Sequence, residues 1–224
     1  MRRFFQKYKY FFLTLIALSG IIIGLFYTAL KPRETLPVYQ PAMVNAELVD
    51  STVQYIKKYH TIADFKLVNQ NGDTITQDVY KGKIYVADFF FTTCPSICPI
   101  MTGNMARIQS EILNDEDVML LSHSVTPVID SVAQLKKYAL EKGVNDRKWN
   151  LVTGDKKQIY ELARKSYLAV KDDGNGDEYD MIHTENFILV DKESRIRGFY
   201  DGTNEAEIEK LLFDLALLKG SYGN

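Results

Sequence analysis

The only two cysteines of the chain, Cys94 and Cys98, are separated by three residues, and each is followed by a proline. On a tight turn this spacing can bring the two Cα atoms within the roughly 4.4–6.8 Å that a disulfide requires. The same closeness allows both sulfurs to bind one soft metal ion. A structural disulfide in an exported domain is the simplest alternative, but so short a ring constrains the unfolded chain little and would stabilise it weakly. The pair therefore favours redox or metal chemistry.

The cysteines lie where a predicted strand runs into a predicted helix. Residues 84–91 are apolar and rich in β-branched and aromatic side chains, which is typical of a buried strand. After Pro99, apolar residues recur at helical spacing as far as Leu113. Thr93 is a candidate cap for this helix. Unpaired amides and the dipole at a helix N-terminus favour a thiolate over a thiol, and the prolines leave the other amides free to face the sulfurs.

The remaining pattern predicts an α/β protein with a mixed sheet and helices on both faces. Residues 60–67 and 74–76 flank a turn signal at Asn71-Gly72 and are expected to form a hairpin. Further strands and helices are expected to alternate, with a late hairpin and a last helix: strands at 118–125, 151–152, 187–190 and 195–200, and helices from about residue 131 to Gly143, at 156–167 and at 205–218. Asp130 and Ser131 are candidate caps for the helix that ends at Gly143. Cysteines at this place resemble the thioredoxin arrangement, with three intervening residues where thioredoxin has two.

The chain has three histidines, and His183 is the candidate third ligand. A lone histidine before a strand is usually structural. In a thioredoxin-like sheet, however, the loop before the late hairpin passes close to the cysteine turn. Two thiolates and one imidazole form a soft, low-coordinate set that suits copper, Cu(I) especially. His123 lies in an apolar strand and is expected to pack in the core, whereas His60 is expected on the surface.

Other metals fit the sequence less well. A structural zinc site is almost always closed by four ligands, so zinc would need His123 or an acid in addition. Residues 173–177 imitate the start of a calcium loop, but Glu178 and Thr184 stand where the glycine and the bidentate acid belong. Met101 and Met105, four residues apart, are explained by core packing.

The N-terminus predicts a membrane anchor. Residues 11–30 contain no charge and are long enough to cross a hydrocarbon layer of roughly 30 Å. Residues 1–10 hold four basic residues and no acid, which predicts a cytoplasmic N-terminus. We expect an uncleaved signal anchor, with a cleaved signal peptide as the alternative. No cysteine lies near the end of the apolar run, which excludes lipoprotein processing.

The rest of the chain is then a linker and one domain outside the cytoplasm, periplasmic in a Gram-negative cell. Residues 31–48 carry three prolines and are expected to be the linker, and residues 49–224 the domain. The 224 residues, 46% of them hydrophobic, allow a sizeable core, and two cysteines are too few for a disulfide scaffold. Acids outnumber bases after residue 30, which argues against a nucleic-acid partner. Outside the cytoplasm disulfides persist unless something reduces them.

Two segments together resemble the SCO/SenC family of membrane-anchored copper proteins. These are residues 89–99, Phe-Phe-Phe-Thr-Thr-Cys-Pro-Ser-Ile-Cys-Pro, and residues 179–191, which contain His183. The resemblance covers roughly residues 60–218. It implies a thioredoxin-like fold and one copper ion bound by Cys94, Cys98 and His183. It also implies a role at the copper A site of cytochrome c oxidase, with the subunit that carries that site and a copper donor or thiol reductant as partners.

The chain departs from the family pattern at two positions. Residues 121–127 occupy the place of the family's Ser-Val-Asp-Pro segment, but Thr126 replaces the aspartate. Ile182 stands where many members have an aspartate before the histidine, which could change how His183 is oriented. Asp180 is close enough in sequence to substitute.

Three functions are compatible with these residues. The first is a copper chaperone. The second is a thiol–disulfide oxidoreductase in which Cys94 attacks a partner disulfide and Cys98 resolves the mixed disulfide. The third is a thiol peroxidase or redox sensor, which ranks last because nothing marks a peroxide pocket. The first two can coexist, since metal binds only when both sulfurs are reduced.

Overall fold

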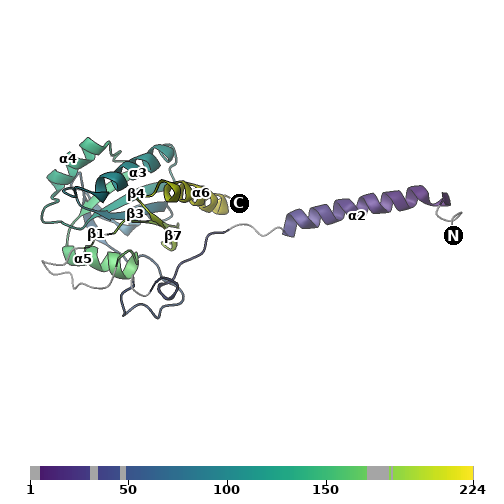
Figure 1. Cartoon of the computed structure of the whole chain (residues 1–224), viewed down its shortest axis with the longest axis horizontal. Helices are drawn as coiled ribbons and strands as arrows, with labels where there is room; N and C mark the ends of the chain where they lie inside the picture. Colours follow the sequence, from purple (N-terminus) through teal and green to yellow (C-terminus); the bar gives the residue numbers. More distant parts are fainter. Residues whose placement is uncertain (1–5, 31–34, 46–48, 171–181, 183, 224) are drawn as a thin grey trace. The chain divides into compact units, whose positions relative to one another are not determined.

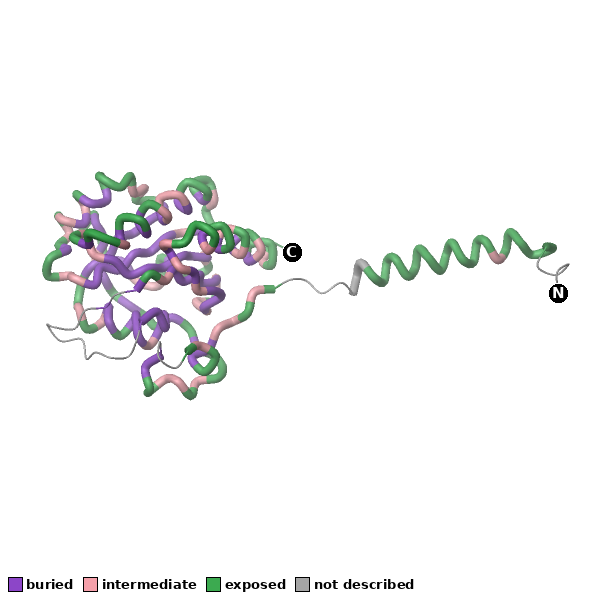
Figure 2. Tube along the Cα trace, in the orientation of Figure 1, coloured by how far each residue is buried: buried purple, intermediate pink, exposed green. Residues whose placement is uncertain are grey.

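The structure is a computed structural model that describes residues 6–30, 35–45, 49–170, 182 and 184–223 (Figure 1). The chain divides into two units, Met1–Thr35 and Leu36–Asn224. In the first unit, helix α2 (Lys9–Leu30) contains the whole of the predicted apolar run at residues 11–30. Its segment Lys9–Tyr27 is long and apolar enough to cross a membrane, and its side chains are exposed almost throughout (Figure 2).

The second unit is built on one mixed sheet. Within the described residues the sheet has seven strands in the order β2-β1-β5-β4-β3-β6-β7. The three central strands β3, β4 and β5 are parallel, the hairpin β1–β2 joins β5 antiparallel, and β6 and β7 extend the sheet antiparallel from β3. The strands are β1 (Lys66–Asn69), β2 (Thr74–Thr76), β3 (Ile84–Phe90), β4 (Val118–Ser124), β5 (Trp149–Thr153), β6 (Asn186–Val190) and β7 (Ile196–Asp201).

Helices cover both faces of the sheet (Figure 1). On one face, α3 (Ile97–Glu111), α4 (Val132–Lys142) and α6 (Glu205–Tyr222) pack around a core that includes Met101, Leu135 and Ile208. On the other face, α5 (Lys156–Glu161) and the π-helical turn η4 (Leu162–Ser166) pack around a second core, which includes Ile159 and Ala163. Figure 2 shows the sheet buried between these two layers. The predicted thioredoxin-like architecture, with its N-terminal hairpin, is confirmed.

Glycines and a helix cap that were recognised in the sequence lie at the ends of several helices and strands. Gly72 closes the first hairpin at φ +85°, and Gly143 ends α4 at φ +70°, a region that favours glycine. The Ser131 hydroxyl caps α4 by accepting from Gln134 N–H at 3.3 Å. In contrast, residues 60–65 lie outside strand β1, so the prediction of a strand at 60–67 is wrong for six of its eight residues.

The helix after the cysteines starts two residues before Pro99, at Ile97, so that Cys98 and Pro99 lie in its first turn. Proline is tolerated there because the first N–H groups of a helix have no intrahelical acceptor. Ser96 is the N-cap residue and makes no side-chain cap, so the predicted role of Thr93 is wrong.

The sheet has two distinct ends. The ladder between β3 and β4 runs from Ile84 opposite Val118 to Phe90 opposite Ser124, and the cysteine loop follows Phe90. We call this the cysteine end. At the other end, β6 terminates with Val190 opposite Tyr85.

The second half of the predicted linker packs against this other end, which we call the linker end. The Arg197 guanidinium donates to the carbonyl oxygens of Leu36 at 2.6 Å and Pro37 at 2.9 Å. It also pairs at 2.9 Å with the carboxylate of Asp191, and both side chains are buried. Tyr39 N–H donates to Ile196 O at 2.9 Å. The chain therefore enters the domain at the end of the sheet that lies away from the cysteines.

Replacing Arg197 by alanine is expected to lower the free energy of unfolding of the Leu36–Asn224 unit by roughly 2–4 kcal/mol, because it leaves a buried carboxylate and two carbonyls with fewer donors. Arg195 also binds Asp191 but is more exposed, so Arg195→Ala should cost about 1 kcal/mol or less. Urea denaturation of both variants measures the difference. Equal losses of unfolding free energy in the two variants would contradict the role of Arg197 in holding Leu36 and Pro37 on the domain.

Candidate metal centre

The two cysteines come together where β3 ends and α3 begins. Cys98 N–H donates to the sulfur of Cys94 at 3.4 Å, and the Ser96 hydroxyl lies 3.8 Å from the same sulfur. Both cysteines are free thiols, with 7% of Cys94 and 3% of Cys98 exposed. They border the core on the α3 side of the sheet. The prediction that amides of the turn face the sulfur is confirmed.

The two thiols differ in acidity. Burial disfavours the Cys94 thiolate, but hydrogen bonds from the amides of Cys98 and Ser96 outweigh this and lower the pKa of Cys94 to about 7. Burial raises the pKa of Cys98 to about 12, with smaller contributions from Cys94 and Asp88. Cys94 is therefore the more acidic of the two thiols, and Cys98 is the thiol that stays protonated near neutral pH.

Asp130 fastens the cysteine loop to the loop after β4. Its buried carboxylate accepts from the amide of Thr92 at 3.2 Å and from the Thr92 hydroxyl at 2.5 Å, two residues before Cys94. It also accepts from the hydroxyls of Ser124 at 2.6 Å and Thr126 at 3.0 Å. A charged acceptor with four donors is a strong local constraint, so the position of Cys94 depends on a residue thirty-six positions away.

The sequence indicated Asp130 only as a possible helix cap. Ser131 performs that role alone, and the aspartate points to Thr92 instead. Thr126, noted as a departure from the family pattern, donates to the same carboxylate. The sequence signal for this role was the group of polar residues Ser124, Thr126 and Asp130 at the end of β4, the strand beside β3.

A second carboxylate, Asp88, is buried in β3 beneath the site. Burial raises its pKa to about 7, opposed by a hydrogen bond to Ser122. One of its oxygens, Oδ1, has no hydrogen-bond partner among the described residues. Tyr138, whose hydroxyl lies 2.7 Å from that of Thr102, has a pKa raised to about 12 by burial and by weaker effects that include Cys98 and Asp88. The site is thus poorly solvated, and the ionisation of Cys98, Asp88 or Tyr138 there is disfavoured by burial.

Two histidines are excluded from the site. His123 is buried on the opposite face of the sheet, where it stacks on Phe89 with ring centroids 4.8 Å apart and its Nδ1 lies 3.3 Å from Asp88 O. The predicted core role is confirmed, and His123 cannot serve as a fourth zinc ligand beside the cysteines. His60 is buried, with Nε2 2.8 Å from Ser166 O, so the predicted surface location is wrong.

The predicted third ligand, His183, lies outside the described residues, as do Asp180 and the acidic loop 171–180. Within the described residues no group of three or more histidine, cysteine or acidic side chains could hold a metal. Met101 and Met105 are fully buried in the core, as expected. The described part of the chain thus supplies two soft sulfur donors, which suit Cu(I).

Comparison with known proteins gives consistent matches. A family model described as SCO1/SenC matches residues 53–216. The SCO1 protein homolog of Bacillus subtilis is 31% identical over 158 residues, which cover 70% of this chain and 81% of that protein.

Among solved structures, a SCO1/SenC family lipoprotein from Bacillus anthracis is 31% identical with a TM-score of 0.63, over 71% of this chain and 95% of that one. Arabidopsis thaliana ScoI, solved with copper bound, is 26% identical with a TM-score of 0.57, over 71% of this chain and 98% of that one.

The acidity difference predicts selective alkylation. In the reduced chain, the rate at which iodoacetamide modifies Cys94 should rise with pH around a midpoint of about 7, because only the thiolate reacts. Cys98 should react slowly until far higher pH. Mass spectrometry of Cys98→Ser and Cys94→Ser measures each sulfur separately. A Cys94 midpoint at the ordinary value near 9 would show that the amides do not stabilise the thiolate.

Asp130→Asn should lower the free energy of unfolding by roughly 2–4 kcal/mol, because a buried anion with four donors becomes an amide that brings donors of its own. It should also raise the alkylation rate of Cys94 by loosening the loop. The control Asp155→Asn changes an exposed N-cap that asparagine can replace, and should cost below about 1 kcal/mol. Unchanged stability and alkylation in Asp130→Asn would refute the assigned role.

Proposed function

This chain belongs to the SCO1/SenC family, and on that basis we propose that it is a membrane-anchored copper chaperone. It binds one copper ion through Cys94, Cys98 and His183 and assists assembly of the copper A site of cytochrome c oxidase. The observation that carries the proposal is the pair of free, buried thiols, with one sulfur accepting from the amide of the other cysteine at 3.4 Å.

Relatives support both the metal and the role. Arabidopsis thaliana ScoI has been solved with copper bound. A 30% identical protein, BsSco, is described as a member of the Sco family of cytochrome c oxidase assembly proteins, and its structure, with a TM-score of 0.61, covers 71% of this chain and 93% of that one. Two thiolates match the softness of Cu(I), and the apolar surroundings keep competing water from the sulfurs.

The strand register supports His183 as the third ligand. Strand β6 is antiparallel to β3, with Ile188 opposite Ala87, so β6 begins at the cysteine end of the sheet. Thr184 just before it is buried and donates its hydroxyl to Ala169 O at 2.8 Å. The chain next to residue 183 is therefore fixed at the same end as the two thiols.

Thiol–disulfide exchange is the second candidate, and the unequal acidity of the thiols favours it. In this reaction the Cys94 thiolate attacks a disulfide of the partner, one partner sulfur leaves as a thiolate, and Cys98 then attacks the mixed disulfide at Cys94. The partner gains two electrons, and Cys94 and Cys98 become a disulfide. The BsSco structure is described as revealing a disulfide switch. Since a disulfide has no thiolate to offer, oxidation of the pair would exclude copper.

The membrane anchor is α2. We infer an N-terminus in the cytoplasm and a domain outside it, with the four basic residues before the apolar run retained on the inner side. The anchor raises the concentration of the domain near a membrane-embedded acceptor. The partners are the oxidase subunit that carries the copper site and a donor of copper or of electrons.

The test is copper per chain for the reduced protein. Wild type should bind about one copper, and Cys94→Ala, Cys98→Ala and His183→Ala should each lose most of the tight binding, because low-coordinate Cu(I) loses a large part of its ligand set with any one donor. Oxidised wild type is the matched control and should bind little. Competition with a coloured Cu(I) chelator gives stoichiometry and relative affinity.

The same variants separate the two functions. If His183→Ala binds copper as wild type does and also keeps full disulfide reductase activity, His183 is not the third ligand. The copper site proposed here then fails, and the oxidoreductase function remains. Loss of copper binding with reductase activity retained supports both activities at one pair of cysteines.

A further inference from the structure

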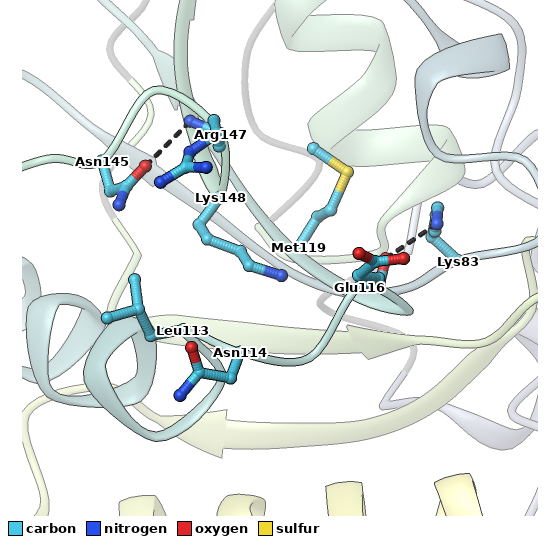
Figure 3. A pocket seen from close by; sticks show the side chains of 8 residues that line it. All are labelled: Lys83, Leu113, Asn114, Glu116, Met119, Asn145, Arg147 and Lys148. Carbon is cyan, nitrogen blue, oxygen red and sulfur yellow. Dashed lines mark hydrogen bonds between the residues drawn. The ribbon is translucent and has the colours of Figure 1, made fainter.

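A cavity of about 610 Å³ opens at the linker end of the sheet and has no role in the proposed copper chemistry (Figure 3). It lies where the three parallel strands begin, since Lys83 precedes β3, Glu116 precedes β4 and Lys148 precedes β5. The lining residues, which we call the basic pocket, are Lys83, Leu113, Asn114, Glu116, Met119, Asn145, Arg147 and Lys148. Three cations thus face one carboxylate.

Only one of the three cations in the basic pocket, Lys83, has a counter-ion among the described residues. The ammonium of Lys148 is held by the carbonyl oxygens of Asp115 and Val118, and it forms no ion pair with any described residue although only 8% of the residue is exposed. Figure 3 shows this amino group directed into the pocket. A buried ammonium with only neutral partners is costly, and a bound anion would offset that cost.

Arg147 adds the group best suited to an oxyanion. Its backbone amide donates to Asn145 Oδ1 at 3.0 Å, whereas its exposed guanidinium makes no hydrogen bond or ion pair within the described residues. A guanidinium offers five donors in a planar fork that fits phosphate oxygens in pairs.

The nearby acids do not cancel this charge. Asp115 pairs with Lys219, and Asp117 pairs with Lys192 at 2.7 Å and with Lys83 at 3.8 Å. Lys83 also donates to the backbone oxygen of Glu116 at 2.7 Å. Glu116 is the carboxylate that remains in the lining, on the Lys83 side and away from Arg147 (Figure 3). The Arg147 and Lys148 side of the pocket is left with uncompensated positive charge.

The basic pocket lies at the same end of the sheet as the attachment of the linker. Arg197 holds Leu36 and Pro37 at the start of β7, three strands from β4 in the sheet, or about 14 Å at the usual strand spacing. Leu36 comes six residues after the end of the apolar helix, and six residues in any conformation span at most about 22 Å. In an anchored chain, the length of these six residues therefore limits how far the linker end of the domain can lie from the lipid surface.

We propose that the basic pocket binds the phosphate of an anionic phospholipid headgroup, with Arg147 and Lys148 as the anion-binding residues. This rests on the membrane anchoring proposed above. Headgroup binding holds the linker end against the bilayer and turns the cysteine end away from it, so the metal site faces outward. Basic pockets near a membrane surface are a known means of headgroup recognition, and such binding weakens as salt is added.

The test uses the full chain reconstituted in vesicles and its only tryptophan, Trp149, which begins β5 beside Lys148. Resonance energy transfer from Trp149 to a dansyl-labelled headgroup should be about twofold higher in phosphatidylcholine vesicles that contain phosphatidylglycerol than in phosphatidylcholine alone. Arg147→Glu should abolish this increase, and so should high salt. Lys137→Glu, the same charge change at an exposed site on α4, should leave it intact.

Equal transfer in the two kinds of vesicle, or an increase that survives Arg147→Glu, would overturn the proposal. Binding of inorganic phosphate by the chain in detergent, without any lipid dependence of the transfer, would assign the pocket to small anions and overturn the lipid assignment. Failure of the anchor is seen separately, because the chain would then be extracted from the vesicles by carbonate. Copper binding by Arg147→Glu should equal that of wild type, since the pocket lies at the other end of the sheet from the thiols.

Discussion

The carboxylate of Asp130 is the interaction on which the cysteine site depends. Strands β3 and β4 run side by side and end at the same level, so the loops that follow them must be joined if either is to hold a fixed shape. Asp130 joins them through Thr92 on one side and Ser124 and Thr126 on the other. With the loop fixed, α3 can begin at Ile97 and direct the Cys98 amide at the Cys94 sulfur. Asp130 thus acts on the cysteine site through the position of the loop, and the amides of Cys98 and Ser96 lower the pKa of Cys94.

The same arrangement makes the two cysteines unequal. Cys94 receives amide hydrogen bonds at the helix start, while Cys98 sits deeper in the first turn, close to the apolar core and to Asp88. A metal ion that binds both sulfurs must displace a proton from Cys98, whose thiol is the weaker acid. A disulfide partner meets Cys94 first. One geometry would therefore suit both proposed activities, and each of them needs the pair in its reduced form.

Much of this could be predicted from the sequence because the signals were local. The cysteine spacing, the apolar run of β3, the Ser131 cap and the Gly143 stop each act within a few residues. The errors came from contacts that are distant in sequence. His60 looked like a surface residue because its acceptor, Ser166 O, belongs to a segment more than a hundred residues later. Asp130 looked like a cap because its partner Thr92 lies 38 positions earlier in the chain.

The length of β3 has a consequence for where the domain can act. The strand has seven residues and separates the linker end from the cysteine end by roughly 20 Å at the usual rise. Arg197 holds Leu36 on the domain, so the spacer after the apolar helix is short, and it spans at most about 22 Å. An anchored chain of this build has a bounded working height. For the proposed delivery of copper, the metal site of the acceptor must then lie within a few nanometres of the bilayer.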